Sequence, residues 1–212
     1  VADADLWRGA GAHQERQPEP PEKIWVSPLD VRFSQNVVYP KFTDGRSVDD
    51  AVEQVRVVQP EDDEAAPLEA EGDEKPPLTL RPPFATIEAV RWCPKLRDGA
   101  GRPLADSRGE ERRGEEALFS VDNRRLYALQ RFALQEWPAV CLARALCVDE
   151  LTPTRLRAEN RKFTNRLCGL QLEVESRSNA FDTFSWVTEA GHAEAQKFCR
   201  PAALRAADRA VS

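Results

Sequence analysis

The stretch "LFSVDNRRLYALQRFA", residues 118–133, constrains the fold more than any other part of the chain. Its first residues are apolar and typical of a strand, and Asp122 interrupts them. The apolar residues that follow recur at helical spacing and form one stripe: Leu126, Leu129, Phe132 and Ala133. A strand over 117–121 that runs directly into a helix over 123–133 needs a sheet against which the helix can pack.

Two segments before this stretch predict further elements. Val31 and Phe33 alternate with polar residues, which is typical of a half-buried strand within 24–35. Ser47 stands three residues before Asp50, and this spacing is that of a capping box at a helix start. We therefore expect a helix over about 48–58.

Two later segments predict strands of the same sheet. The stretch 81–92 has Ile87 and Val90 as core candidates, and the strand over 117–121 is its expected hairpin partner. A further strand is expected over 139–148, with four small residues on one face: Cys141, Ala143, Ala145 and Cys147. The mixture of elements predicts an α+β domain over 24–150.

The remaining segments are predicted to lie outside this domain or to connect its elements. Residues 1–23 are polar and rich in proline, which predicts an extended arm. Residues 59–83 are rich in acids and proline and predict a linker, and 94–114 predict a long exposed loop. Residues 151–212 predict a helical C-terminal extension, with one helix over 151–170 and part of 188–212 also helical.

The net charge of −6 is concentrated in one place. Residues 61–75 carry eight acids and one lysine, which leaves 28 acids and 29 bases elsewhere. This balance argues against a broad nucleic-acid-binding face. The basic run 154–166, with five bases and one acid, is read as a solvated helix face rather than a phosphate-binding patch. No apolar run approaches the ~20 residues that span a bilayer.

The cysteines and histidines favour no metal or catalytic site. The five cysteines have scattered spacings and no CxxC pair: Cys93, Cys141, Cys147, Cys168 and Cys199. Only two histidines are present, so neither a zinc site nor a Ser/His/Asp set can be assembled. Free thiols, most of them buried, indicate an intracellular, reducing compartment.

The middle of the chain resembles the ParB/sulfiredoxin-like superfamily, over about residues 24–150. The segments that carry the resemblance are "SPLDVRFSQ", "SVDDAVEQV", "TIEAVRW", "LFSVDNRRLYALQ" and "AVCLARALCV". In that family a hairpin leads into a Gly-Glu-Arg-Arg or Gly-Cys-His-Arg turn, which a helix and a strand follow. The resemblance implies a small mixed sheet with packed helices.

In the ParB branch the turn helps to bind a nucleoside triphosphate, since helix-start amides attract an anion. The resemblance places Asn123, Arg124 and Arg125 at the Glu-Arg-Arg positions, and it implies CTP or ATP with magnesium as the ligand. Asp122 replaces the glycine, and an aspartate here is expected to cap the helix and to occupy those amides. The reactive cysteine of the sulfiredoxin branch has no counterpart in this turn.

These departures favour a structural role for the arginines. Arg124 is expected to pair with Asp122 or Asp44, and Arg125 to lie against the C-terminal tail. The sequence thus favours a non-catalytic binding or assembly module without a cofactor. The alternatives are a CTP- or ATP-binding switch that uses Arg124 and Arg125, and a ParB-like DNA-binding protein.

The extensions suggest how such a module works. Residues 1–23 and 59–83 contain too little apolar material to offset the ordering cost of ~1–2 kcal/mol per residue. We therefore expect them to order on the surface of a larger assembly. An accessory subunit of an organellar complex, such as a photosystem, respiratory complex or ribosome, fits this expectation. The absence of methionine suggests a plastid or mitochondrial chain whose presequence was removed.

Overall fold

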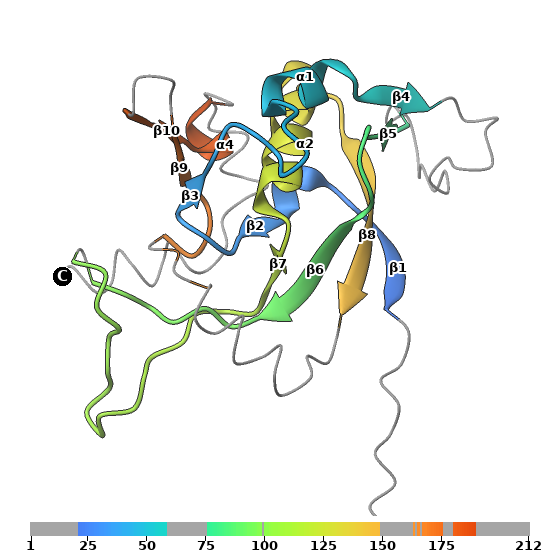
Figure 1. The fold of residues 1–212 in the computed structure, drawn as a ribbon. Helices are drawn as coiled ribbons and strands as arrows, with labels where there is room; N and C mark the ends of the chain where they lie inside the picture. Colours follow the sequence, from blue (N-terminus) through green and yellow to red (C-terminus); the bar gives the residue numbers. More distant parts are fainter. Residues whose placement is uncertain are drawn as a thin grey trace, which may run out of the picture.

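The computed structural model describes residues 21–58, 76–98, 100–148, 163, 165, 167–175 and 180–189 (Figure 1). The described elements combine helices and strands, as the α+β prediction requires. In chain order they are β1 (Glu22–Val26), η1 (Pro28–Asp30), β2 (Arg32–Phe33), β3 (Val37–Val38), α1 (Val48–Glu53), β4 (Arg56–Val58), β5 (Leu78–Arg81), β6 (Ile87–Trp92), β7 (Ala117–Ser120), α2 (Asn123–Gln135), β8 (Cys141–Val148), β9 (Leu172–Glu175), β10 (Phe181–Phe184) and α4 (Trp186–Glu189).

The larger sheet has seven strands and is built around β8. Its order is β2-β7-β6-β8-β5-β4, and β1 pairs with β8 outside this path. β8 runs parallel to β5 and β6 and antiparallel to β1. The four small residues predicted to share one face of β8 are all buried: Cys141, Ala143, Ala145 and Cys147. Small side chains on this face allow a helix to approach the sheet closely.

α2 is the helix that covers the sheet, and most of its predicted stripe is correct. Leu126, Leu129 and Ala133 are at most 1% exposed. Phe132 also packs against the core, as predicted, but its ring is only partly buried. Gln130 is fully buried, and its Nε2 donates to the carbonyls of Pro28 and Val31 at 3.0 and 2.9 Å. This amide ties α2 to the segment after β1.

α1 begins as predicted and ends earlier. The Oγ of Ser47 accepts from the backbone N–H of Asp50 at 2.9 Å, and the Asp50 carboxylate accepts from the Ser47 N–H, which completes the capping box. The helix ends at Glu53, and β4 occupies the region predicted as its last turn. The run of β-branched valines after the helix favours a strand, which pairs antiparallel with β5.

The predicted linker is wrong at its C-terminal end. β5 lies within 59–83 and contributes Leu80 to the core. It pairs with β4 and β8, because its alternating leucines fit a half-buried strand despite the flanking prolines. Residues 59–75 and 1–20 lie outside the described residues. At the N-terminal boundary, Glu22 and Lys23 already belong to β1, so the sheet begins slightly before residue 24.

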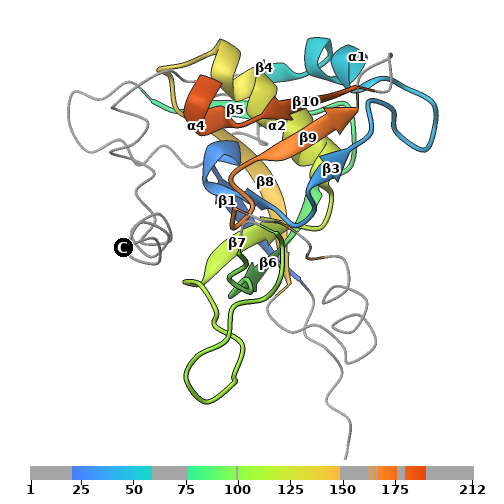
Figure 2. The same ribbon diagram turned by 90° about the vertical axis from the view of Figure 1, so that its left-hand side faces the viewer.

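A second, three-stranded sheet corrects the predicted helical C-terminal extension. Its order is β10-β9-β3, and it lies in front of α2 in Figure 2. Phe163, Asn165 and 167–170 are not helical either. A turn at Cys168 and Gly169, with φ of 49° and 75°, directs the chain into β9. Leu172 and Phe184 then bury their side chains, and the Tyr127 and Phe184 rings meet edge to face at 4.7 Å. Of the described part of 151–212, only α4 is helical.

The segment between β6 and β7, residues 93–116, is called the β6–β7 arm and extends away from both sheets (Figures 1 and 2). It is exposed as predicted, but it has regular hydrogen bonds. The backbone N–H groups of Leu96, Leu104 and Arg112 donate to the carbonyls of Arg112, Leu96 and Leu104 at 2.9, 2.8 and 2.8 Å. These three residues therefore form a junction from which two tight turns project, 98–102 and 106–110.

Candidate functional site

The turn between β7 and α2 is the first candidate site, and Asp122 does not act there as the predicted cap. No described side chain caps the first turn of α2. The Oδ2 of Asp122 instead accepts from the Glu88 N–H at 3.0 Å and pairs with Arg125 Nη1 at 3.3 Å. Its own N–H donates to Ser120 Oγ at 3.0 Å. The carboxylate thus joins β6 to the helix and does not cap the helix-start amides.

Asn123 is buried and serves the framework of the turn. Its Oδ1 accepts from the Ser34 N–H at 2.8 Å, and its Nδ2 donates to Ser34 Oγ at 2.9 Å. Both ends of the amide are therefore used by the segment that follows β2. An asparagine can make this pair of contacts because its amide carries both a donor and an acceptor. A glutamate carboxylate at this position would lack the donor.

Both arginines find partners within the chain, as expected, but the partners differ from the predicted ones. Asp122 pairs with Arg125 rather than with Arg124, and Arg124 Nη1 donates to the carbonyl of Lys41. The predicted pairing of Arg124 with Asp44 is not formed either, because Asp44 pairs with Arg46 at 2.8 Å. The C-terminal tail from 190, against which Arg125 was expected to lie, is outside the described residues. The Arg46 hydrogen bonds hold the pKa of Asp44 below its usual value.

A pocket of about 360 Å³ lies at this turn. This volume falls within the ~300–1,000 Å³ range of small-molecule sites. The pocket is lined by Gln35, Val37, Val38, Tyr39, Phe42, Thr43, Val121, Asp122, Asn123, Arg124 and Arg125. It combines apolar walls with two guanidinium groups and the positive end of the α2 dipole, so an anion is the ligand class that it suits.

The sequence analysis singled out Asn123, Arg124 and Arg125, which all line the pocket. It missed the residues around them. Tyr39 and Phe42 line the pocket, while Ser34, Lys41 and Glu88 hold the turn in place. All but Glu88 come from the segment after β2. Its "YPKFTDG" stretch contains a turn signal that could have placed it near a helix start, but nothing in it names α2 as the partner.

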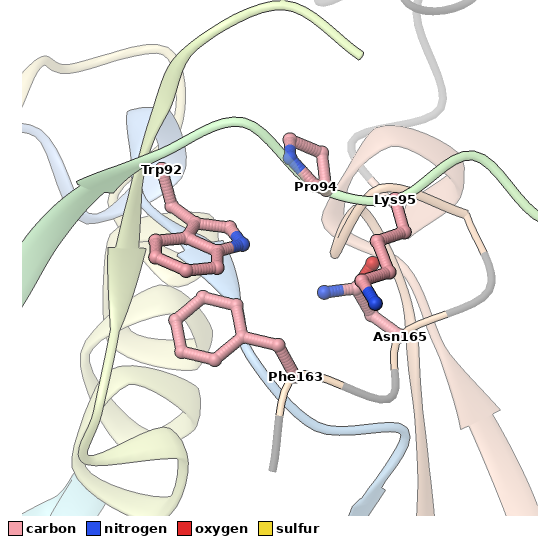
Figure 3. A pocket seen from close by; sticks show the side chains of 5 residues that line it. All are labelled: Trp92, Pro94, Lys95, Phe163 and Asn165. Carbon is pink, nitrogen blue, oxygen red and sulfur yellow. The ribbon is translucent and has the colours of Figure 1, made fainter. Parts of the chain in front are cut away.

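A second, much smaller cavity lies where the end of β6 meets Phe163 and Asn165 (Figure 3). Its volume of about 10 Å³ accommodates at most one water molecule. The rings of Trp92 and Phe163 meet at a tilt of 43° with centroids 5.0 Å apart, and Asn165 Nδ2 donates to the Phe33 carbonyl at 3.3 Å. Phe163 and Asn165 belong to the basic run 154–166, which was predicted to be a solvated helix face, yet both are buried. The rest of that run lies outside the described residues.

The described cysteines are free thiols, as predicted. Cys141 and Cys147 are buried, while Cys93 and Cys168 are partly buried. Burial, with a smaller contribution from Glu136, raises the pKa of Cys141 to about 11, so its thiol is a poor nucleophile at neutral pH. Cys199 lies outside the described residues. Within the described ranges no group of three or more His, Cys, Asp or Glu side chains could hold a metal ion.

Among the described residues no helix is long and apolar enough to cross a membrane. A comparison with family models, curated proteins and solved structures finds no match for this chain.

Proposed function

We propose that this chain is a non-catalytic binding module with a ParB/sulfiredoxin-like domain and that it works as an accessory subunit of a larger protein assembly. The observation that carries the proposal is the pair of exposed aromatic residues Tyr39 and Phe181, which are 57% and 51% exposed. Both belong to the region of the β10-β9-β3 sheet. Exposed aromatic side chains favour a protein partner, since they supply large apolar contact area.

The turn at Asp122 supports the non-catalytic part of this proposal. A general base needs a carboxylate or imidazole that is free to take a proton. The Asp122 carboxylate is engaged by the Glu88 N–H and by Arg125. Asn123 cannot titrate, and its amide is used by Ser34. The turn therefore offers groups that hold a ligand and none that is poised for acid–base chemistry.

The proposal is tested by purifying the full chain, with a small affinity tag, under mild conditions from its source cells. We expect it to elute well above its monomer mass of 23.8 kDa, together with the same partners in each preparation. An organellar complex such as a photosystem, respiratory complex or ribosome is the kind of partner that the sequence suggests. Elution as a monomer from fresh extract would contradict the proposal.

A second candidate function is a CTP- or ATP-binding switch, and the pocket at the start of α2 specifically favours it. The pocket contains Arg124 and Arg125, and the amides of the first helical turn have no side-chain cap among the described residues. The feature that opposes it is the use of both arginines by the chain's own oxygens, because a triphosphate would have to replace the Lys41 carbonyl and Asp122.

Isothermal titration with CTP, ATP and GTP in the presence of magnesium decides between these candidates. We expect no binding tighter than millimolar, because the internal partners already satisfy part of each guanidinium group. Arg46→Ala, at an exposed site outside the pocket lining, is the matched control for Arg124→Ala. A micromolar constant that is lost in Arg124→Ala and kept in Arg46→Ala would establish the nucleotide switch instead.

A further inference from the structure

The outer face of the β10-β9-β3 sheet places Phe181 beside an acidic side chain. Phe181 pairs with Glu175 in the register of β10 and β9, so the two side chains lie on the same face. Glu173, which pairs with Val37 of β3, belongs to this face as well. The opposite face is the one that buries Leu172, Val38 and Phe184. An exposed aromatic ring thus stands next to two carboxylates on the solvent side.

The charge of this sheet is entirely negative within its described strands. β9 and β10 contain the acids Glu173, Glu175 and Asp182, and the three strands contain no lysine or arginine. None of these carboxylates forms an ion pair with a described residue. The surface therefore complements a positively charged partner.

One edge of this sheet has no partner among the described strands. β10 pairs with β9 on one side, and no described strand pairs with its other side. Such an edge presents backbone N–H and C=O groups to an extended peptide. A strand added there would lie ~10 Å from β9, about twice the normal strand spacing. An arginine or lysine on the added strand and Glu175 can span that distance, with the aliphatic stem of the base over the Phe181 ring.

We propose that the edge of β10 away from β9 docks an extended basic segment of a partner protein, which adds a strand to the β10-β9-β3 sheet and sets its cationic side chains against Phe181 and Glu175. This inference rests on the proposed role in an assembly and names the chemistry of the partner there. Backbone pairing supplies the affinity for an extended segment. The aromatic ring and the carboxylates supply the selectivity for basic side chains.

Fluorescence polarisation with the full chain tests the proposal directly. The probe is a labelled ten-residue peptide of alternating arginine and valine, and the matched probe carries glutamate in place of arginine. A third probe repeats the basic sequence with an N-methyl group on every residue, which blocks strand pairing along both edges. We expect the unmodified basic peptide to bind at least tenfold more tightly than either matched probe.

The protein variants separate local docking from general attraction to an acidic chain. Glu175→Lys and Phe181→Ser should each weaken binding of the basic peptide by tenfold or more. Glu115→Lys, at an exposed acid of the β6–β7 arm, changes the net charge equally and should weaken binding no more than twofold. Equal effects of Glu175→Lys and Glu115→Lys, or full binding by the N-methylated probe, would overturn the docking proposal.

Elution of the chain from source cells distinguishes this inference from the proposed function. Loss of the co-eluting partners in Glu175→Lys supports the docking surface. Retention of every partner in that variant rejects the surface and leaves the assembly role in place. Monomeric elution of the unchanged chain rejects the assembly role, whatever the peptide experiment shows.

Discussion

At the scale of single residues, Gly169 occupies a position that leaves no room for a side chain. Its N–Cα torsion φ is +75°, and an added Cβ would lie 2.3 Å from the Phe33 carbonyl oxygen and 2.9 Å from the Phe119 ring. Its own carbonyl accepts from the Phe33 N–H at 2.9 Å. Only a residue without a side chain allows the turn before β9 to pack directly against β2.

Gly169→Ala is therefore expected to lower the free energy of unfolding by roughly 3–5 kcal/mol. Gly109→Ala is the matched control, since Gly109 has a φ of +81° with nothing within 4 Å of an added Cβ. That control should lose only the ~1–2 kcal/mol of the left-handed backbone. Urea denaturation of both variants measures the difference. Equal losses would show that the close contact with Phe33 contributes nothing.

Cys141 gives the folded state a dependence on alkaline pH. Burial raises the pKa of its thiol from 9.0 to about 11, so the unfolded chain loses this proton at lower pH than the folded one. The contribution to stability is complete below about pH 9 and disappears as the pH rises through 11. Between pH 8 and 10.5 the unchanged chain should lose roughly 2 kcal/mol more than Cys141→Ala. A parallel decline of both proteins in urea titrations would exclude this effect of Cys141.

At the scale of elements, the two sides of α2 should differ in how much they stabilise the fold. Leu126 is fully buried, and its replacement by alanine is expected to remove about 2–5 kcal/mol from the free energy of unfolding. Phe132→Ala should remove only about 1–2 kcal/mol, because this ring is partly exposed. Guanidinium titrations compare the two variants. A larger loss for Phe132→Ala than for Leu126→Ala would contradict this ranking by burial.

The elements that the sequence could predict are those whose pattern is local. The capping box of α1, the stripe of α2 and the alternation of β8 all depend on neighbours along the chain. β5 and β9 could not be predicted in this way, because Leu78–Arg81 is surrounded by prolines and Leu172–Glu175 has the composition of a helix. Their strand state depends on partners that are distant in sequence. The same holds for the Lys41 carbonyl that binds Arg124.

The β6–β7 arm shows a signal that could have been used. The pattern Leu-x-Asp-x-x-Gly occurs at 96–101 and again at 104–109. In both copies the aspartate Oδ1 accepts two backbone N–H groups, at 2.9 and 2.8 Å for Asp98 and at 2.8 and 2.9 Å for Asp106. The glycines have a φ of 81°. This is the chemistry of a three-residue hairpin turn, and its repetition predicts two such turns rather than an irregular loop.

At the scale of the whole molecule, the acid- and proline-rich segments should behave differently alone and in an assembly. Residues 1–20 and 59–75 lack the apolar content that would order them on their own. Limited proteolysis of the purified chain should cut both segments first. Within the native complex, Trp7 and Leu68 should lie on partner surfaces and the cuts should slow markedly. Resistance of both segments in the isolated chain would remove a main support of the assembly role.

The central position of β8 sets the order in which this protein can be built by the ribosome. β1, β5 and β6 are all synthesised before β8, and each of them uses β8 as a partner. Trp25 of β1, for example, pairs with Arg144 of β8, which is synthesised much later. Until β8 has been made, β1 therefore has no partner among the described strands, and β5 and β6 each lack one of their two partners. We expect slow folding in one late step and a need for chaperone protection of those strands during synthesis.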